Sequence, residues 1–112
     1  MALHHFHSGE VARIGAIDDA STRTTALART SSFEAVHLVA RAGQTIPEHR
    51  VSGSLTLYCI AGHIRLGGDA PAELRTGDWV FLEPGTPHTV EAIVDTSLLL
   101  TILFDESGRP GA

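Results

Sequence analysis

Two histidines in separate stretches of this 112-residue chain have the type and setting that best fit a chemical role. His49 follows Gly43 by five intervening residues and precedes Gly62 by twelve, while His88 ends the run Gly85-Thr86-Pro87-His88. A neutral imidazole binds transition metals, and it titrates near physiological pH, so a histidine pair can hold a metal or exchange protons. Either role requires a scaffold that brings the two stretches together.

The hydrophobic pattern predicts a scaffold of short β-strands. Residues 54–60 alternate, with Leu55, Leu57 and Cys59 on one face. Further apolar runs separated by glycine- and proline-rich turns lie at 33–42, 63–66, 79–82, 88–93 and 97–104. Strands at this spacing are typical of an all-β sandwich or barrel. Residues 22–29 fit either a capped helix or an edge strand, and both alternatives remain open.

The order of these glycines, prolines and histidines resembles the two motifs of the cupin family, small RmlC-like barrels with a double-stranded β-helix or jelly-roll fold. The first motif corresponds to residues 43–62 and the second to residues 77–88. The resemblance covers residues 33–104 and implies one all-β jelly-roll domain over 1–112, with an arm at 1–32 and a tail at 105–112. A fold of this kind hosts many unrelated activities.

The resemblance also implies a metal site that this sequence only half retains. In metal-dependent cupins the first motif supplies two histidines and a glutamate, and the second supplies one histidine. The first and last of these positions are His49 and His88, but the other two are Val51 and Leu55. Valine and leucine have no lone pair to offer a metal. We therefore expect either no cofactor or a weakly bound iron, manganese, nickel or zinc ion at His49 and His88.

Inward-facing side chains are expected to line a partly apolar pocket inside the barrel. They are Val51, Leu55, Leu57, Cys59, Trp79 and Phe81. Two other histidines, His37 and His63, are expected to face outward because they alternate with apolar neighbours. Asp78 follows Gly77 and is expected to form a turn rather than to act as an acid.

Composition excludes several classes of function. The chain has eight basic residues, all arginine, and thirteen acidic residues, which give a net charge of −5, so nucleic acid and anionic membranes are not expected partners. The absence of lysine excludes Schiff-base chemistry and a P-loop. The single cysteine, Cys59, excludes an internal disulfide and a cysteine zinc cage, which fits a cytoplasmic protein. The apolar stretch 98–104 is far shorter than the ~20 residues that span a bilayer.

Three hypotheses for function follow, from different classes. The first is a barrel that binds a small, partly apolar organic molecule near His49 and His88. The alternative is a metal-dependent enzyme of the dioxygenase or isomerase type, in which water or substrate completes the metal site. The third is an interaction module. A homodimer is expected in each case, because the outward face that carries Tyr58 and Ile60 is partly apolar and requires a cover.

Overall fold

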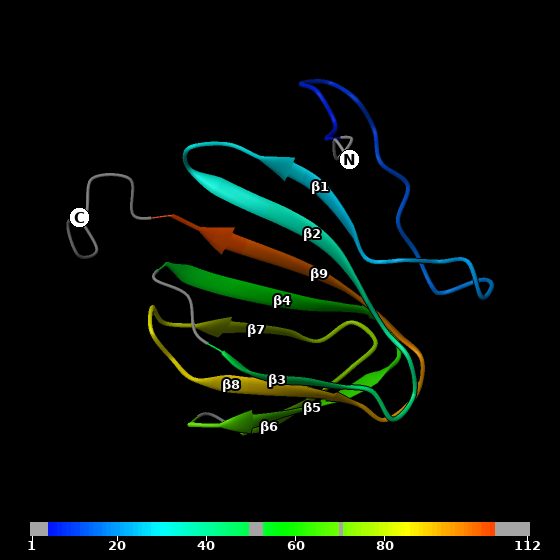
Figure 1. The fold of residues 1–112 in the computed structure, drawn as a ribbon, viewed down its shortest axis with the longest axis vertical. Helices are drawn as coiled ribbons and strands as arrows, with labels where there is room; N and C mark the ends of the chain where they lie inside the picture. The colour runs from blue at the N-terminus through cyan, green and yellow to red at the C-terminus, as the bar shows by residue number, and fades with distance from the viewer. Residues whose placement is uncertain (1–4, 50–52, 70, 105–112) are drawn as a thin grey trace.

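Two antiparallel sheets lie against each other and enclose the core (Figure 1). The computed structural model describes residues 5–49, 53–69 and 71–104, with the backbone alone at 47–49. The large sheet has the order β1 (Thr25–Arg29), β2 (Phe33–Ala40), β9 (Thr96–Leu103), β4 (Ser54–Ala61), β7 (Trp79–Leu82). The small sheet has the order β3 (Thr45–His49), β8 (His88–Ala92), β5 (His63–Gly68), β6 (Ala72–Arg75). The all-β prediction is confirmed, since the described residues contain no helix.

Alternating side chains on the facing sides of the two sheets form the core. On β4, Leu55, Leu57 and Cys59 are buried, as their spacing predicted. On β5, Ile64 and Leu66 are buried in the same way, from the opposite sheet. The core cluster also takes one buried residue from each of β6, β7, β8 and β9, namely Leu74, Leu82, Val90 and Leu98. Burial of apolar surface between the sheets is the main force that holds them together.

The structure decides one alternative that the sequence left open, and it contains two strands that the sequence did not predict. The segment at 22–29 contains the edge strand β1 rather than a helix, and its Thr-rich sequence suits an extended edge. Strands β3 and β6 were not predicted. Both are short and carry little apolar alternation, so their extended form depends on pairing with β8 and β5. Tertiary pairing of this kind overrides weak local propensity.

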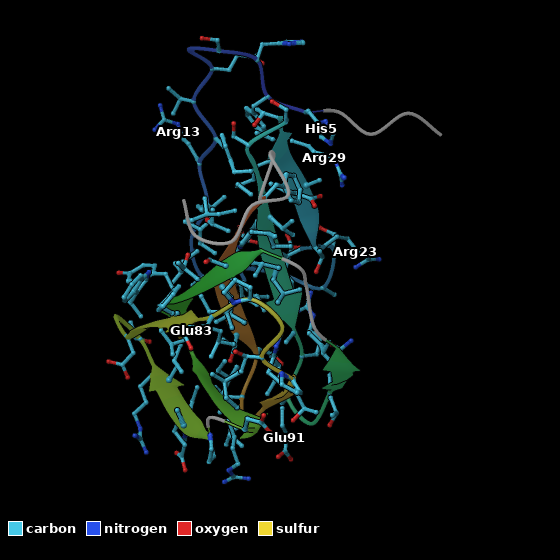
Figure 2. The ribbon with its side chains drawn as sticks, turned by 90° about the vertical axis from the view of Figure 1, so that its left-hand side faces the viewer. His5, Arg13, Arg23, Arg29, Glu83 and Glu91 are labelled. Atoms are coloured by element: carbon cyan, nitrogen blue, oxygen red, sulfur yellow. The ribbon has the colours of Figure 1, made fainter. Side chains whose placement is uncertain are left out.

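The outer face of the small sheet is charged. His63 Nε2 lies 2.7 Å from Glu73 Oε1, so this histidine faces outward as expected. Arg65 pairs with Glu91 at 3.3 Å and Arg75 with Glu73 at 3.5 Å. The hydrogen bond from His63 is the main reason that the pKa of Glu73 lies below its ordinary value. Figure 2 shows Glu91 on the side of the small sheet that faces away from the large sheet.

The outer face of the large sheet is apolar instead. Register pairs Tyr58 with Trp79 and Thr56 with Phe81 across β4 and β7. Tyr58, Trp79 and Phe81 are all exposed, as is Leu103 at the end of β9. We call the outward side of β2, β9, β4 and β7 the aromatic face. No helix among the described residues is long and apolar enough to cross a membrane.

Candidate functional site

A cavity of about 90 Å³ lies between the two sheets. Among the described residues of its wall, one side chain is polar, that of His88 on β8. The other lining residues that the structure describes are aliphatic: Leu38, Ile46, Leu55, Leu57, Val90, Leu100 and Ile102. These side chains come from β2, β9 and β4 of the large sheet and from β3 and β8 of the small sheet. A concave apolar wall with a single polar group has the layout of a small-molecule site.

The backbone register brings the two candidate histidines to opposite positions on neighbouring strands. His49, the last residue of β3, pairs with His88, the first residue of β8. Ile46 pairs with Val90, and an irregularity between Ile46 and His49 then shifts the register so that His49 pairs with His88. Directly opposed residues in an antiparallel pair have Cα atoms about 4.5–5.5 Å apart. Metal binding at these two positions stays a prediction.

The imidazole of His88 is held by the loop that precedes it. His88 is buried, with 4% of its surface exposed, and its Nδ1 lies 3.1 Å from the carbonyl oxygen of Thr86. The Thr86 amide and hydroxyl both donate to the carbonyl of Glu83, at 3.2 and 2.7 Å, which closes the turn between β7 and β8. Figure 2 shows Glu83, an exposed loop carboxylate, at this end of the sheet.

The described donors do not fit a metal site with three or four protein ligands. Within the described ranges, no group of three or more His, Cys, Asp or Glu side chains could hold an ion. Leu55, where the resemblance implied that other cupins have a metal ligand, packs into the apolar wall of the cavity. Val51, the other substituted position and an expected pocket residue, lies outside the described residues. Tight retention of a first-row metal normally requires at least three protein ligands.

Trp79 and Phe81 do not line the pocket, so that prediction is wrong. Trp79 is 61% exposed and Phe81 is 48% exposed, on the outward side of β7. Because Leu82 pairs with the inward residue Leu55, the alternating positions Trp79 and Phe81 must point outward. The run Trp79–Leu82 is apolar throughout, so its sequence contains no alternation that could have indicated the face.

Cys59 is inward and fully buried, but it lies in the core beyond the cavity wall, which corrects its placement among the pocket residues. It lies four positions beyond Leu55 in the strand, about 13 Å at ~3.3 Å per residue. Burial raises the pKa of the Cys59 thiol, and the nearby charge of Asp78 raises it further. Asp78 itself accepts a hydrogen bond from the Arg75 amide at 2.8 Å, as expected for a turn residue.

Sequence reasoning missed five residues of the cavity wall: Leu38, Ile46, Val90, Leu100 and Ile102. Val90 could have been found, because it follows His88 by two residues in the same strand and shares its face. Leu100 and Ile102 lie in the apolar stretch Leu98–Leu103, where alternation is too weak to indicate a face.

His37 is buried rather than exposed. It projects from the outward side of β2, opposite Leu99, yet only 8% of its surface is accessible. Its Nε2 lies 2.5 Å from the hydroxyl of Ser97, which is fully buried. The strand alternation was interpreted correctly, but this part of the outer face is covered instead of solvated. Because Ser97 has no exposed surface, the pair cannot present a nucleophile to a substrate.

Burial lowers the pKa of His37 below its ordinary value, which makes stability depend on pH. As pH falls below about 6.5, the unfolded chain takes up a proton that the folded protein still excludes, so unfolding becomes more favourable. The cross-strand neighbours Thr25 and Leu99 carry no charge that could compensate. Between pH 7.5 and pH 5, we expect the free energy of unfolding to fall more in wild type than in His37→Gln. The difference should be at most about 1.4 kcal/mol for each pH unit. Urea unfolding at both pH values checks this, and equal losses contradict it.

The comparisons with known proteins agree with this architecture. A family model described as Cupin domain matches residues 36–104, more than half of the chain. The chain belongs to the cupin family. A comparison with curated proteins gave no match. The jelly-roll prediction is confirmed by solved cupin structures of the same double-stranded β-helix fold.

Three solved structures illustrate how this cupin is related to others. An RmlC-like cupin from Desulfovibrio desulfuricans has a TM-score of 0.71 and 25% identity, covering 87% of this chain and 97% of that one. A cupin superfamily protein from Desulfitobacterium hafniense has a TM-score of 0.72 and 16% identity, covering 80% and 83%. A conserved protein of unknown function from Streptococcus pyogenes has a TM-score of 0.72 and 17% identity, covering 100% of both chains. The last two likenesses show the fold alone.

Proposed function

We propose that this cupin binds a small, largely apolar organic molecule in the cavity between its sheets. The observation that supports the proposal is the composition of the wall, whose described lining is aliphatic apart from the side chain of His88. An apolar occupant that fills such a wall gains about 0.8 kcal/mol for each methylene that it buries. The imidazole gives this wall a polar edge, beside which a polar atom of the occupant can lie.

The cavity volume limits the size of the occupant. An engineered cavity of about 150 Å³ holds benzene, which has six non-hydrogen atoms. By proportion, the cavity of about 90 Å³ suits a molecule of roughly four non-hydrogen atoms. The best small ligands gain at most about 1.5 kcal/mol per atom and most gain much less, so we expect dissociation constants on the order of 1–10 mM for simple probes.

Filling the cavity should abolish binding. In Val90→Phe the ring occupies the space beside His88, and we expect butan-2-ol to bind at least about tenfold more weakly than to wild type. The matched control is Val94→Phe, the same substitution at an exposed loop position, which should bind as wild type does. Titration of ¹⁵N-labelled protein followed by NMR measures each constant, and circular dichroism checks folding. Failure of wild type to bind any small neutral probe contradicts the proposal.

The alternative, a metal-dependent enzyme, is favoured by one observation, the pairing of His49 with His88 across β3 and β8. Elemental analysis of protein purified without a histidine tag separates the two functions. Near-stoichiometric iron, manganese, nickel or zinc that is lost in both His49→Ala and His88→Ala would support the enzyme. Substoichiometric metal that neither substitution changes supports the organic ligand.

We also propose that a second copy of the chain covers the aromatic face. In the described part of the chain, the outward positions of β2, β9, β4 and β7 include no Asp, Glu or Arg. Two copies that each carry a net charge of −5 repel each other, and an uncharged face is where that repulsion is weakest. Exposed Trp79, Phe81 and Tyr58 are residues of the type that anchor protein interfaces. A two-fold axis through this face forms a closed dimer.

A further inference from the structure

Exposure across the aromatic face rises from β2 to β7. The register places one residue from each of four strands side by side on this face: His37 on β2, Leu99 on β9, Tyr58 on β4 and Trp79 on β7. His37 is 8% exposed at one end of this row, and Trp79 is 61% exposed at the other. Ser97, which bonds His37 from β9, is fully buried as well. The small sheet packs on the opposite face of these strands, so another part of the chain must cover the β2 side.

The segment before β1 is fastened beside this covered part. We call residues 5–24 the N-terminal segment. Near its start, the Phe6 amide donates a hydrogen bond to a carbonyl of β1 at 2.7 Å. Near its end, the Arg41 guanidinium donates to the carbonyls of Asp19 and Thr22, at 3.1 and 2.9 Å. Because Arg41 directly follows the last residue of β2, these bonds hold the N-terminal segment next to β1 and β2.

The middle of the N-terminal segment has an apolar side and a charged side. Ala12, Ile14 and Ile17 are half-buried. The charged side chains of the segment are all exposed: Glu10, Arg13, Asp18, Asp19 and Arg23. Figure 2 shows the Arg13 side chain pointing away from the large sheet. Apolar side chains that pack on a sheet leave charged ones in water, so the segment suits a cover of the β2 side that carries its charges on the outside.

These charges determine where a second copy can pack. Charged residues are depleted at the centre of protein interfaces, because a buried charge without a partner is costly. In a two-fold dimer, a copy that packed over the N-terminal segment would bury the charges of this segment against those of its own. Over β4 and β7 a second copy meets uncharged side chains instead, those of Thr56, Tyr58, Trp79 and Phe81.

We infer that the N-terminal segment covers the β2 side of the aromatic face and that the second copy packs on the side formed by β4 and β7. The inference rests on the proposed function, because it assumes that a second copy covers this face. It adds the part of the face that the second copy occupies, and it assigns to the N-terminal segment the role of covering His37.

Cross-saturation NMR tests the inference on the wild-type protein. Perdeuterated, ¹⁵N-labelled copies are mixed with unlabelled copies at a concentration at which the protein is dimeric, and the protons of the unlabelled copies are saturated. We expect the amide signals of Thr56 and Tyr58, on β4, to lose intensity, because these residues lie near the partner. The amide signals of His37 and Val39, on β2, should keep their intensity, because the N-terminal segment separates them from the partner.

Two variants test the same assignment by sedimentation velocity, with circular dichroism as the check of folding. Thr56→Glu places a charge in the inferred interface, and we expect the dimer dissociation constant to rise at least about tenfold. Arg13→Glu is the matched control, because it makes the chain more acidic than Thr56→Glu does but lies on the outside of the N-terminal segment. It should change the dissociation constant by less than about threefold.

The outcomes separate this inference from the proposed dimer. An intensity loss on β2 as large as that on β4 would mean that the partner, rather than the N-terminal segment, covers His37. A larger effect of Arg13→Glu than of Thr56→Glu would place the second copy over the segment. Either result overturns the inference and leaves the dimer intact. A dimer whose intensity losses lie on neither strand, or a wild-type protein that stays monomeric in the sedimentation experiment, overturns both.

Discussion

Replacing Gly62 with alanine is expected to lower the free energy of unfolding by about 2–5 kcal/mol. Gly62 joins β4 to β5 with a φ of 128°, a conformation that costs an L-residue about 1–2 kcal/mol. A Cβ atom there would lie 2.4 Å from Oγ1 of Thr96 and 2.7 Å from its Cα. Such overpacking costs roughly another 1–3 kcal/mol.

Thr96 cannot move aside to relieve the contact. It is fully buried, and its hydroxyl oxygen accepts a hydrogen bond from the His63 amide at 3.0 Å. The hydroxyl also lies 2.8 Å from the carbonyl of Val94, to which it donates. A shift of Thr96 would break these bonds in a place where lost partners are not replaced by water. The strain therefore remains in the folded protein.

Gly77→Ala is the matched control for this substitution. Gly77 also has a positive φ, 93°, but no atom lies within 4 Å of the Cβ position. The free energy of unfolding of Gly77→Ala should fall only by the conformational cost of the positive φ, about 1–2 kcal/mol. Urea unfolding of the two variants beside wild type measures the difference. Equal losses for Gly62→Ala and Gly77→Ala would mean that close packing against Thr96 contributes nothing.

The sequence predicted correctly which side of a strand faces the core where polar and apolar residues alternate strictly. In β4, Leu55, Leu57 and Cys59 are all buried, as their spacing predicted. The run Trp79–Leu82 is uniformly apolar, and a period of two cannot be found in it. The face of that strand depends on its register with β4, which no local pattern encodes.

The candidate site shows the same division between local and tertiary information. The resemblance to the cupin motifs implied a site at His88, and the alternation of β4 predicted that Leu55 and Leu57 face inward. The irregularity in β3 that pairs His49 with His88 depends on the partner strand, so the sequence could not supply it. Burial of His37 depends on what covers the outer face of the large sheet, which strand alternation does not report.

Placing negative charges on the aromatic face should prevent the proposed dimer from forming. Trp79 and Phe81 together are expected to contribute most of the dimer affinity. Truncating a large aromatic anchor of an interface typically costs about 2 kcal/mol or more of binding free energy. Introducing Trp79→Glu and Phe81→Glu in one variant also places like charges opposite each other across a two-fold axis. We therefore expect the dimer dissociation constant to rise by about 100-fold or more.

The control for that variant must add the same charge on a different face. Arg75→Glu changes the net charge by two negative units, as the double variant does, but it lies on the outer face of the small sheet. If general repulsion separated the copies, both variants would dissociate; if the aromatic face is the interface, Arg75→Glu stays dimeric. Sedimentation velocity over a range of concentrations distinguishes these outcomes, and a wild-type protein that is monomeric at 100-micromolar concentrations contradicts the dimer itself.

Because the His88 cavity lies between the sheets and the aromatic face lies outside them, we expect the monomeric variant to keep its affinity for butan-2-ol.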